Sequence, residues 1–187
     1  MAKPRILVPL AQGCEELEAV TITDLLTRAG FTVVTAGLDD KPVTASRGMV
    51  LMPATTMQAI IDEDFDMIVL PGGLPGADYL RDNDLVQRKL IELAEQGKYI
   101  AAICAAPQAL ASAGLLENKT ATGYPGVLDK LNITGLRLST DPVVIDGNII
   151  TSQGPGTAMD FALSLIALLA GSEKRNEVEK PLMRPAA

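Results

Sequence analysis

The chain contains no histidine and no tryptophan, and it has only three phenylalanines and three tyrosines. Without histidine it can form no Ser-His-Asp triad, no Cys-His dyad and no zinc site with imidazole ligands. The scarcity of aromatic rings argues against a nucleic-acid platform that stacks bases. The net charge of −7 argues the same way, because phosphate backbones attract basic surfaces. We therefore expect no nucleic-acid partner.

Cysteine is also scarce, since Cys14 and Cys104 are the two in 187 residues. Two cysteines form neither a disulfide framework nor, without histidine, a metal site, so we expect free thiols and no metal or cofactor. No apolar run reaches the roughly 18 residues of a membrane span, and the longest, residues 161–170, predicts a buried helix. The first residues lack the pattern of a signal peptide. We expect a cytoplasmic protein without a membrane partner.

Short apolar segments alternate with longer amphipathic ones along the chain. We predict strands at residues 5–11, 31–38, 67–70 and 99–103, one or two short strands within 42–53, and a hairpin at 143–151. We predict helices at residues 15–30, 84–96, 105–113 and 154–170, with a short polar helix after the last. This alternation indicates an α/β fold in which helices cover both faces of a mostly parallel sheet. Without a repeat or a break in composition, residues 1–187 form a single domain.

In a parallel sheet, functional sites lie beyond the carboxyl ends of the strands. At one such end, an apolar strand passes into a helix across Cys104 with almost no loop between them. A turn this sharp predicts a nucleophile elbow with strained backbone angles, and the following helix N-terminus favours the thiolate. A cysteine among apolar residues is, however, more often an inert part of the core. The spacing alone leaves both interpretations open.

Two other strand ends bring polar groups near this position. Gly72 and Gly73 follow residues 67–70, and their N–H groups could hold an oxyanion, although any tight turn can contain two glycines. Glu15, Glu16 and Glu18 lie in the first turn of a helix, where the helix dipole accounts for two of them and the third could point toward Cys104.

Two further features have competing interpretations. Cys14 is either a loop or core thiol or a resolving partner for Cys104. Residues 154–157 (GPGT) either cap the last helix or bind a phosphate group, and no lysine nearby supports the second alternative.

Four motifs together carry a family resemblance. They are residues 11–18 (AQGCEELE), 69–73 (VLPGG), 101–107 (AAICAAP) and 151–157 (TSQGPGT). In this order they resemble the DJ-1/ThiJ/PfpI superfamily, in the branch of the Parkinson's-disease-linked protein, over nearly the whole chain. The resemblance implies a flavodoxin-like, doubly wound sheet and a homodimer.

The resemblance also implies roles for individual residues. Cys104 would be the elbow cysteine, readily oxidised to a sulfinate, and Glu18 would hydrogen-bond to its sulfur. Gly73 and Ala105 would supply backbone donors beside the sulfur, with Gly72 as an accessory group. The resemblance further places Arg28 and Arg47 near the site and the dimer interface, where small anions bind.

The sequence departs from the family pattern where many members have a histidine. The peptidase-like branch has one directly after the cysteine, where this chain has Ala105, so we expect no peptidase. The other family histidine falls at Tyr124. Chemistry that needs a histidine would therefore depend on Tyr124 or Glu18 as a replacement.

These residues favour an enzyme of the glyoxalase III or protein-deglycase type. The Cys104 thiolate would add to a reactive carbonyl, such as methylglyoxal or a glycated side chain, while Gly73 and Ala105 hold the oxyanion and Glu18 moves protons. Two acidic groups in contact should share one proton near neutral pH. The alternative is a non-catalytic redox sensor of the stress response, in which Cys104 stops at the sulfinate. The family also suggests a chaperone, for which the sequence shows no large apolar surface stripe.

Overall fold

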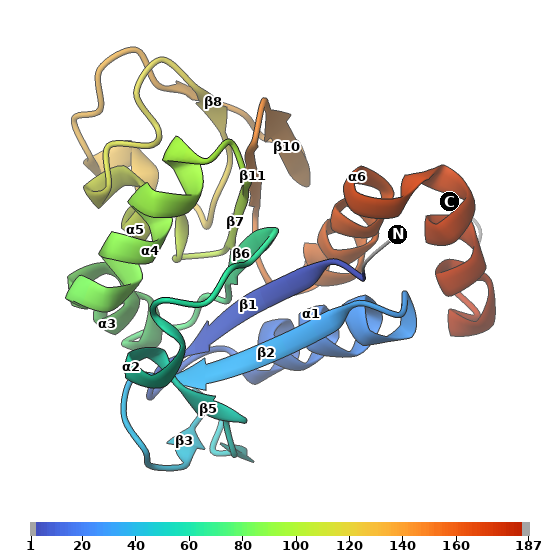
Figure 1. The fold of residues 1–187 in the computed structure, drawn as a ribbon. Helices are drawn as coiled ribbons and strands as arrows, with labels where there is room; N and C mark the ends of the chain where they lie inside the picture. The colour runs from blue at the N-terminus through green and yellow to red at the C-terminus, as the bar shows by residue number, and fades with distance from the viewer. Residues whose placement is uncertain (1–2, 185–187) are drawn as a thin grey trace.

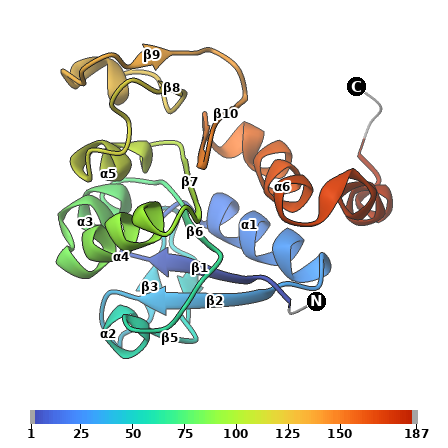
Figure 2. The same cartoon turned by 45° about the horizontal axis from the view of Figure 1, so that its top comes forward.

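The computed structural model describes residues 3–184, and its centre is a seven-stranded sheet with helices on both faces (Figure 1). The sheet strands are β1 (Arg5–Leu10), β2 (Thr32–Gly37), β5 (Thr55–Thr56), β6 (Met67–Leu70), β7 (Tyr99–Ile103), β10 (Val143–Asp146) and β11 (Ile149–Ser152). The helices are α1 (Glu16–Arg28), α2 (Met57–Ile60), α3 (Gly76–Asp82), α4 (Asp84–Glu95), α5 (Pro107–Ser112) and α6 (Ala158–Glu179). Two short pairs, β3 (Val43–Thr44) with β4 (Val50–Leu51) and β8 (Thr120–Ala121) with β9 (Arg137–Leu138), lie outside the main sheet. Figure 2 shows β8 and β9 beyond α5.

The order of the strands determines where a site can form. It runs β10-β11-β7-β6-β1-β2-β5, and all neighbours are parallel except β10 and β11. The chain leaves β1 toward β2 and later continues from β6 toward β7, in the opposite direction. In such sheets a crevice opens beyond the carboxyl ends of the strands where the direction changes. The predicted doubly wound, mostly parallel sheet in a single domain is confirmed.

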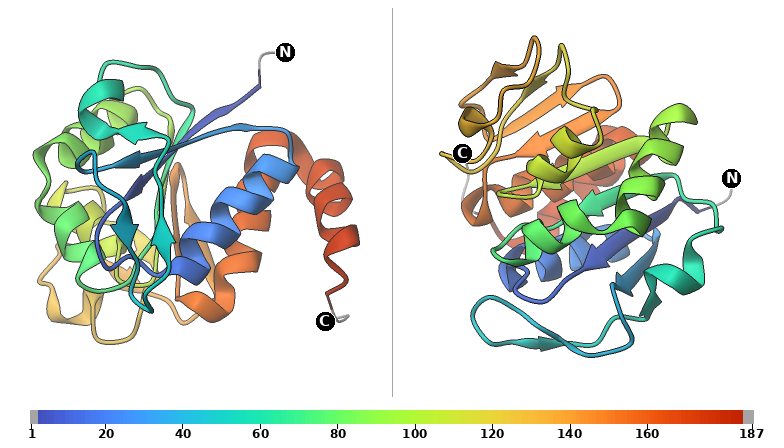
Figure 3. Two further views of the ribbon diagram at one scale, coloured as in Figure 1. Left: turned by 90° about the horizontal axis from the view of Figure 1, so that it is seen from below. Right: turned by 90° about the vertical axis from the view of Figure 1, so that its left-hand side faces the viewer.

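Successive side chains of the central strands point to opposite faces of the sheet, and this divides the core into two layers. In β1, Ile6 and Val8 pack with α1 and α6, whereas Leu7 packs with α4 and α5 on the other face. The right-hand view of Figure 3 shows α4 and α5 in front of the sheet and α1 and α6 behind it. Cys104 belongs to the layer that contains α1. This arrangement brings a side chain of α1 to the end of β7.

Several elements match the sequence-based prediction, and others were missed. The hairpin forms as β10 and β11, and Gly171, with φ of 83°, interrupts α6 where the long helix was expected to end. The helix α3 was missed because its first residue, Gly76, closes a stretch of proline and glycine that reads as a loop. The helix expected from residue 105 begins at Pro107, since residues 104–106 form the turn.

One segment of the described residues, Pro155–Leu182, is long and apolar enough to cross a membrane by these two criteria alone. The core helix of a globular fold passes the same test. Here Gly171 breaks the helical conformation, and the part before it packs against α1. The segment is therefore weak evidence, and the absence of a membrane partner stays a prediction.

Candidate active site

Cys104 adopts a backbone conformation that is rare for a residue with a side chain. Its φ is 63°, directly after β7. Two backbone hydrogen bonds hold it there: Cys104 N donates to the Ser152 carbonyl at 3.0 Å, and Tyr124 N donates to the Cys104 carbonyl at 2.8 Å. Strain of this kind persists only where the surroundings enforce it, and it gathers at functional sites. The predicted elbow is present.

Two glycines let the loop after β6 approach this elbow. A Cβ on Gly72 would lie 2.6 Å from Cys104 Cβ and 2.8 Å from the Ile103 carbonyl oxygen. Gly73 has φ of 86°, which favours glycine, and a Cβ there would lie 2.7 Å from the carbonyl carbon of Cys14. Any larger residue at either position would push the loop away from the sulfur.

Glu18 extends from the first turn of α1 into the space between this loop and the elbow. Its side chain is fully buried. Oε2 accepts a hydrogen bond of 2.7 Å from Gly72 N, and Oε1 has no partner among conventional donors in the described residues. Burial raises the pKa of the Glu18 carboxyl to about 7, while the Gly72 N–H and the neighbouring Cys104 thiol act in the opposite direction. The carboxyl therefore titrates well above the ordinary range of a glutamate.

Burial, together with the adjacent Glu18 charge, raises the pKa of the Cys104 thiol to about 12. The N–H groups of Gly73 and Ala105 hydrogen-bond to the sulfur and lower the pKa, but they do not outweigh burial. Burial and the Glu18 charge oppose the thiolate, and the expectation that the helix N-terminus favours it stays a prediction. The contribution of α5 is limited, because this helix has only six residues and begins at Pro107. The two acids form a coupled pair that retains one proton above about pH 7.

A pocket of about 340 Å³ opens above the sulfur. Cys104 is only 8% exposed, and that exposure faces this pocket. The lining residues are Glu15, Ser46, Arg47, Gly73, Leu74, Cys104, Ala105, Tyr124, Val127 and Pro155. The pocket is therefore lined by residues that were predicted for the site, namely Arg47, Gly73, Cys104, Ala105 and Tyr124, and by several that the sequence did not predict. Ser46 and Leu74 are two of those missed, because both come from loops whose positions depend on the folded sheet.

The polar side of the pocket is held by Glu16. Its carboxylate accepts the Arg47 N–H at 2.9 Å and the Ser46 hydroxyl at 2.9 Å, which fixes the loop that follows β3 onto the start of α1. Within residues 3–184 the Arg47 guanidinium pairs with no carboxylate, so its charge remains available at the pocket.

Besides Glu18 and Gly72, which are hydrogen-bonded to each other next to the elbow, two predicted residues do not line the pocket. Arg28 lies exposed in the last turn of α1 and pairs with Asp24 at 2.6 Å, so the structure does not support its placement near the sulfur. Its place in a dimer interface stays a prediction. Cys14 is fully buried beneath the loop around Gly76, burial raises its pKa to about 11, and both cysteines are free. In the described part of the chain, no three His, Cys, Asp or Glu side chains are grouped to hold a metal ion.

Comparison with known proteins places this geometry in a family. Residues 4–168 match the model of the DJ-1/PfpI family. Protein dj-1beta of Drosophila melanogaster is 43% identical over 178 residues, 95% of each chain, and a crystal structure of Drosophila melanogaster DJ-1beta gives a TM-score of 0.94 at 41% identity, over 99% of this chain and 100% of that one.

Two other relatives cover almost the whole chain. A Caenorhabditis elegans protein named glutathione-independent glyoxalase DJR-1.2 is 36% identical over 177 residues, which are 95% of this chain and 94% of that protein. The solved structure of oxidised Toxoplasma gondii DJ-1 gives a TM-score of 0.92 at 37% identity, over 98% of this chain and 100% of that one. With this sequence match over most of its length and the same fold, the chain belongs to the DJ-1/PfpI family.

Proposed function

We propose that this protein is a stress-response enzyme that converts small α-ketoaldehydes, such as methylglyoxal, to 2-hydroxy acids by means of Cys104 and Glu18. The observation that carries the proposal is the buried pair: a thiol in an elbow beside a carboxyl whose pKa is raised to about 7. A group with a pKa near the working pH can both accept and donate a proton. Family membership, with a relative named as a glutathione-independent glyoxalase, supports the same class of reaction.

The first step is addition of sulfur to the aldehyde carbon. The Glu18 carboxylate takes the thiol proton as the sulfur–carbon bond forms, which avoids a free thiolate whose pKa is high. The aldehyde oxygen gains the negative charge as its π bond breaks. The N–H groups of Gly73 and Ala105 lie beside the sulfur, where they can donate to this oxygen. Proton return to the oxygen gives a hemithioacetal.

The second step is an internal redox change that needs no external oxidant. Glu18 removes the proton from the former aldehyde carbon, giving an enediol, and a proton is returned to the neighbouring ketone carbon. The aldehyde carbon is thereby oxidised to a thioester and the ketone carbon is reduced to an alcohol. Water then hydrolyses the thioester, which releases the 2-hydroxy acid and restores the Cys104 thiol. In a glycated side chain the former aldehyde carbon already carries the amine, guanidine or thiol. Cys104 would displace that group as Glu18 passes it the thiol proton, and the second step would then proceed as above.

The test is methylglyoxal turnover with lactate as the readout. We expect wild type and Cys14→Ser to be active, because Cys14 lies outside the pocket. We expect Cys104→Ser and Glu18→Gln to lose turnover, since one lacks the nucleophile and the other the proton carrier. Equal lactate formation by wild type and Cys104→Ser would refute the proposal.

A second function is favoured by the unpartnered Glu18 oxygen and by the oxidised state of the Toxoplasma relative. In this alternative, two molecules of hydrogen peroxide oxidise the thiol to a sulfinate and leave two molecules of water. A protonated Glu18 would donate to one sulfinate oxygen through Oε1, and the Gly73 and Ala105 N–H groups would stabilise the charge. Mass spectrometry after graded peroxide should show two added oxygens on the Cys104 peptide and none on the Cys14 peptide. Equal oxidation of both cysteines would exclude a dedicated sensor.

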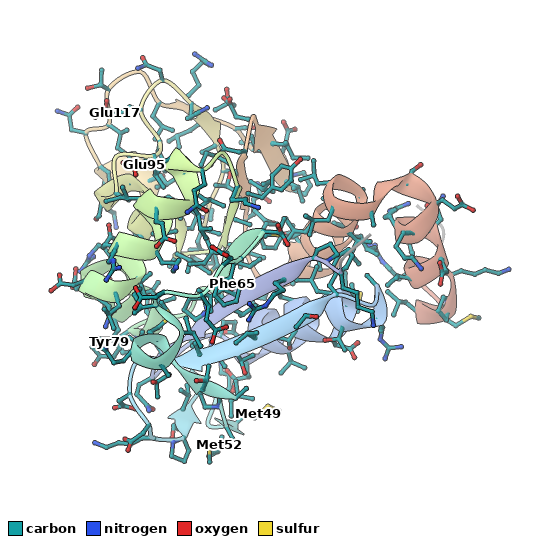
Figure 4. The ribbon with its side chains drawn as sticks, viewed as in Figure 1. Met49, Met52, Phe65, Tyr79, Glu95 and Glu117 are labelled. Carbon is teal, nitrogen blue, oxygen red and sulfur yellow. The ribbon has the colours of Figure 1, made fainter. Side chains whose placement is uncertain are left out.

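We also propose that the protein forms a homodimer through one apolar face. Large apolar side chains are exposed on α1 and on the neighbouring β3–β4 pair: Leu17, Val20, Met49, Val50 and Met52. Val20 and Met52 line one shallow pocket, so these two elements are adjacent. Figure 4 shows Met49 and Met52 projecting from this end of the molecule. A contiguous apolar face of this kind is typical of an interaction surface.

A further inference from the structure

The pocket above Cys104 has two walls of different character. Glu15, Ser46 and Arg47 form a polar wall, and Leu74, Tyr124, Val127 and Pro155 form an apolar one. Leu74 is 59% exposed and Tyr124 is 52% exposed. Large apolar side chains on the rim of a pocket favour a ligand that covers them.

Gly154 defines the space between the tyrosine ring and the sulfur. A Cβ at this position would lie 3.4 Å from Tyr124 Cδ2 and 4.0 Å from Cys104 Sγ, so it would touch both. The φ of Gly154 is 165°, an extended conformation that any residue adopts. The backbone therefore does not require glycine here. The missing side chain leaves a gap about one methyl group wide between ring and nucleophile.

The pocket is also larger than the smallest substrates need. A three-carbon ketoaldehyde has five heavy atoms and fills about the volume of three water molecules, roughly 90 Å³. The pocket holds about 340 Å³. A substrate whose carbonyls reach Cys104 would leave room for a further group of ring size beside Tyr124.

From these observations we infer that the substrates are α-ketoaldehydes with a flat apolar substituent on the ketone carbon, of which arylglyoxals are the simplest. The inference rests on the proposed function and names its substrate class. The aryl group packs on Tyr124 and Leu74 with one edge at the gap beside Gly154, while the dicarbonyl end lies at Cys104 and the Gly73 and Ala105 N–H groups. The reaction is balanced as before: one arylglyoxal and one water give one aryl 2-hydroxy acid.

The first test compares kcat/KM for phenylglyoxal and methylglyoxal, with mandelate and lactate as products. The two aldehydes differ in intrinsic reactivity, so the informative quantity is the change in their ratio between variants. Tyr124→Ala should lower the phenylglyoxal to methylglyoxal ratio roughly two- to tenfold, the range expected for an aromatic pair. Tyr124→Phe should preserve the ratio, because it keeps the ring. Tyr79→Ala is the matched control: Tyr79 is 50% exposed but lies on α3 and lines a different pocket (Figure 4).

Gly154→Ala tests the space itself. The added methyl group should lower turnover of phenylglyoxal more than turnover of methylglyoxal, since the larger substrate occupies that space. A ratio that is unchanged in both Tyr124→Ala and Gly154→Ala overturns the inference. A phenylglyoxal to methylglyoxal ratio that falls in Tyr124→Phe as far as in Tyr124→Ala also overturns the inference. The hydroxyl group would then be responsible rather than the apolar wall.

A binding measurement separates this inference from the proposed function. Mandelate should protect Cys104 from iodoacetamide at lower concentration than lactate does, and Tyr124→Ala should remove the difference. Unlike phenylglyoxal, mandelate does not modify arginine, so Arg47 stays intact. Wild type that turns over neither aldehyde refutes the proposed function. Equal protection by mandelate and lactate refutes the apolar wall as the substrate-selecting surface, whether or not turnover is seen.

Discussion

The backbone N–H of Gly72 donates a hydrogen bond of 2.7 Å to Oε2 of Glu18, and this bond leaves Oε1 for the sulfur of Cys104. The carboxyl is thus oriented by the same loop whose next N–H, that of Gly73, hydrogen-bonds to the sulfur. Orientation of an acid–base group by a backbone donor leaves it free to exchange its proton on the other side.

The coupled pair predicts two ionisations in the alkylation of Cys104. In wild type, the rate of reaction with iodoacetamide should rise with pH in two steps, the first near pH 7, where the pair loses its first proton. Glu18→Gln should show a single step, because glutamine has no proton to share. Rates measured by mass spectrometry between pH 5 and pH 10, in a Cys14→Ser background, check this. Two steps retained in Glu18→Gln would contradict the coupling.

The same carboxyl makes the stability of the fold depend on pH. Its pKa is raised from the ordinary 4.5 to about 7 in the folded protein, so the unfolded chain releases this proton at lower pH than the folded one. This stabilising contribution is complete below pH 4.5 and is lost as pH rises through 7. The loss amounts to about 3 kcal/mol in wild type.

Chemical denaturation at pH 4.5 and pH 8 measures this effect. Glu18→Gln should be the more stable variant at pH 8 and should lose much less stability than wild type between these values. An identical pH dependence in the two proteins would show that Glu18 is not protonated on folding.

The close approach of Gly72 to the elbow predicts a steric cost. Gly72→Ala places a methyl group 2.6 Å from Cys104 Cβ, which should destabilise the protein by about 1–3 kcal/mol and reduce turnover. Gly156→Ala is the control, because a Cβ there meets nothing within 4 Å. Urea midpoints and lactate formation give the two readouts. Normal activity in Gly72→Ala would mean that the loop can move without disturbing the sulfur.

The proposed dimer face can be tested with two matched substitutions. Val20 on α1 and Ile91 on α4 are both 43% exposed, but only Val20 lies on the apolar face. Val20→Asp should convert the dimer to a monomer, whereas Ile91→Asp should leave it intact, as judged by light scattering after size exclusion. A monomeric wild type, or a dimeric Val20→Asp protein, would place the contact elsewhere or exclude it.

The elbow could be predicted from sequence because its signal is local. An apolar strand that runs into a helix without a loop requires a sharp turn at Cys104, and the small residues around it make that turn feasible. The walls of the pocket carry no such signal. Ser46 reaches the site because its loop is held by Glu16, and Tyr124 reaches it through a backbone bond to Cys104. Both depend on contacts between distant segments.

The shared proton could be predicted from sequence, because two acidic groups in contact disfavour a second negative charge, but the degree of burial could not. The pattern indicated an acid beside the cysteine, but it could not show how strongly burial would oppose the helix dipole at the sulfur. That balance depends on how completely Glu18 and Cys104 are covered, which is a property of the packed layer between the sheet and α1. Composition alone does not determine it.

The hydrogen bond from Cys104 N to the Ser152 carbonyl has a consequence for biosynthesis. The elbow draws on α1, on the loop after β6 and on β11, which the ribosome makes in that order. Until Ser152 has left the exit tunnel and joined the sheet, the hydrogen bond that holds the Cys104 N–H has no acceptor. The elbow is therefore completed late, and a nascent or truncated chain without β11 would lack this support.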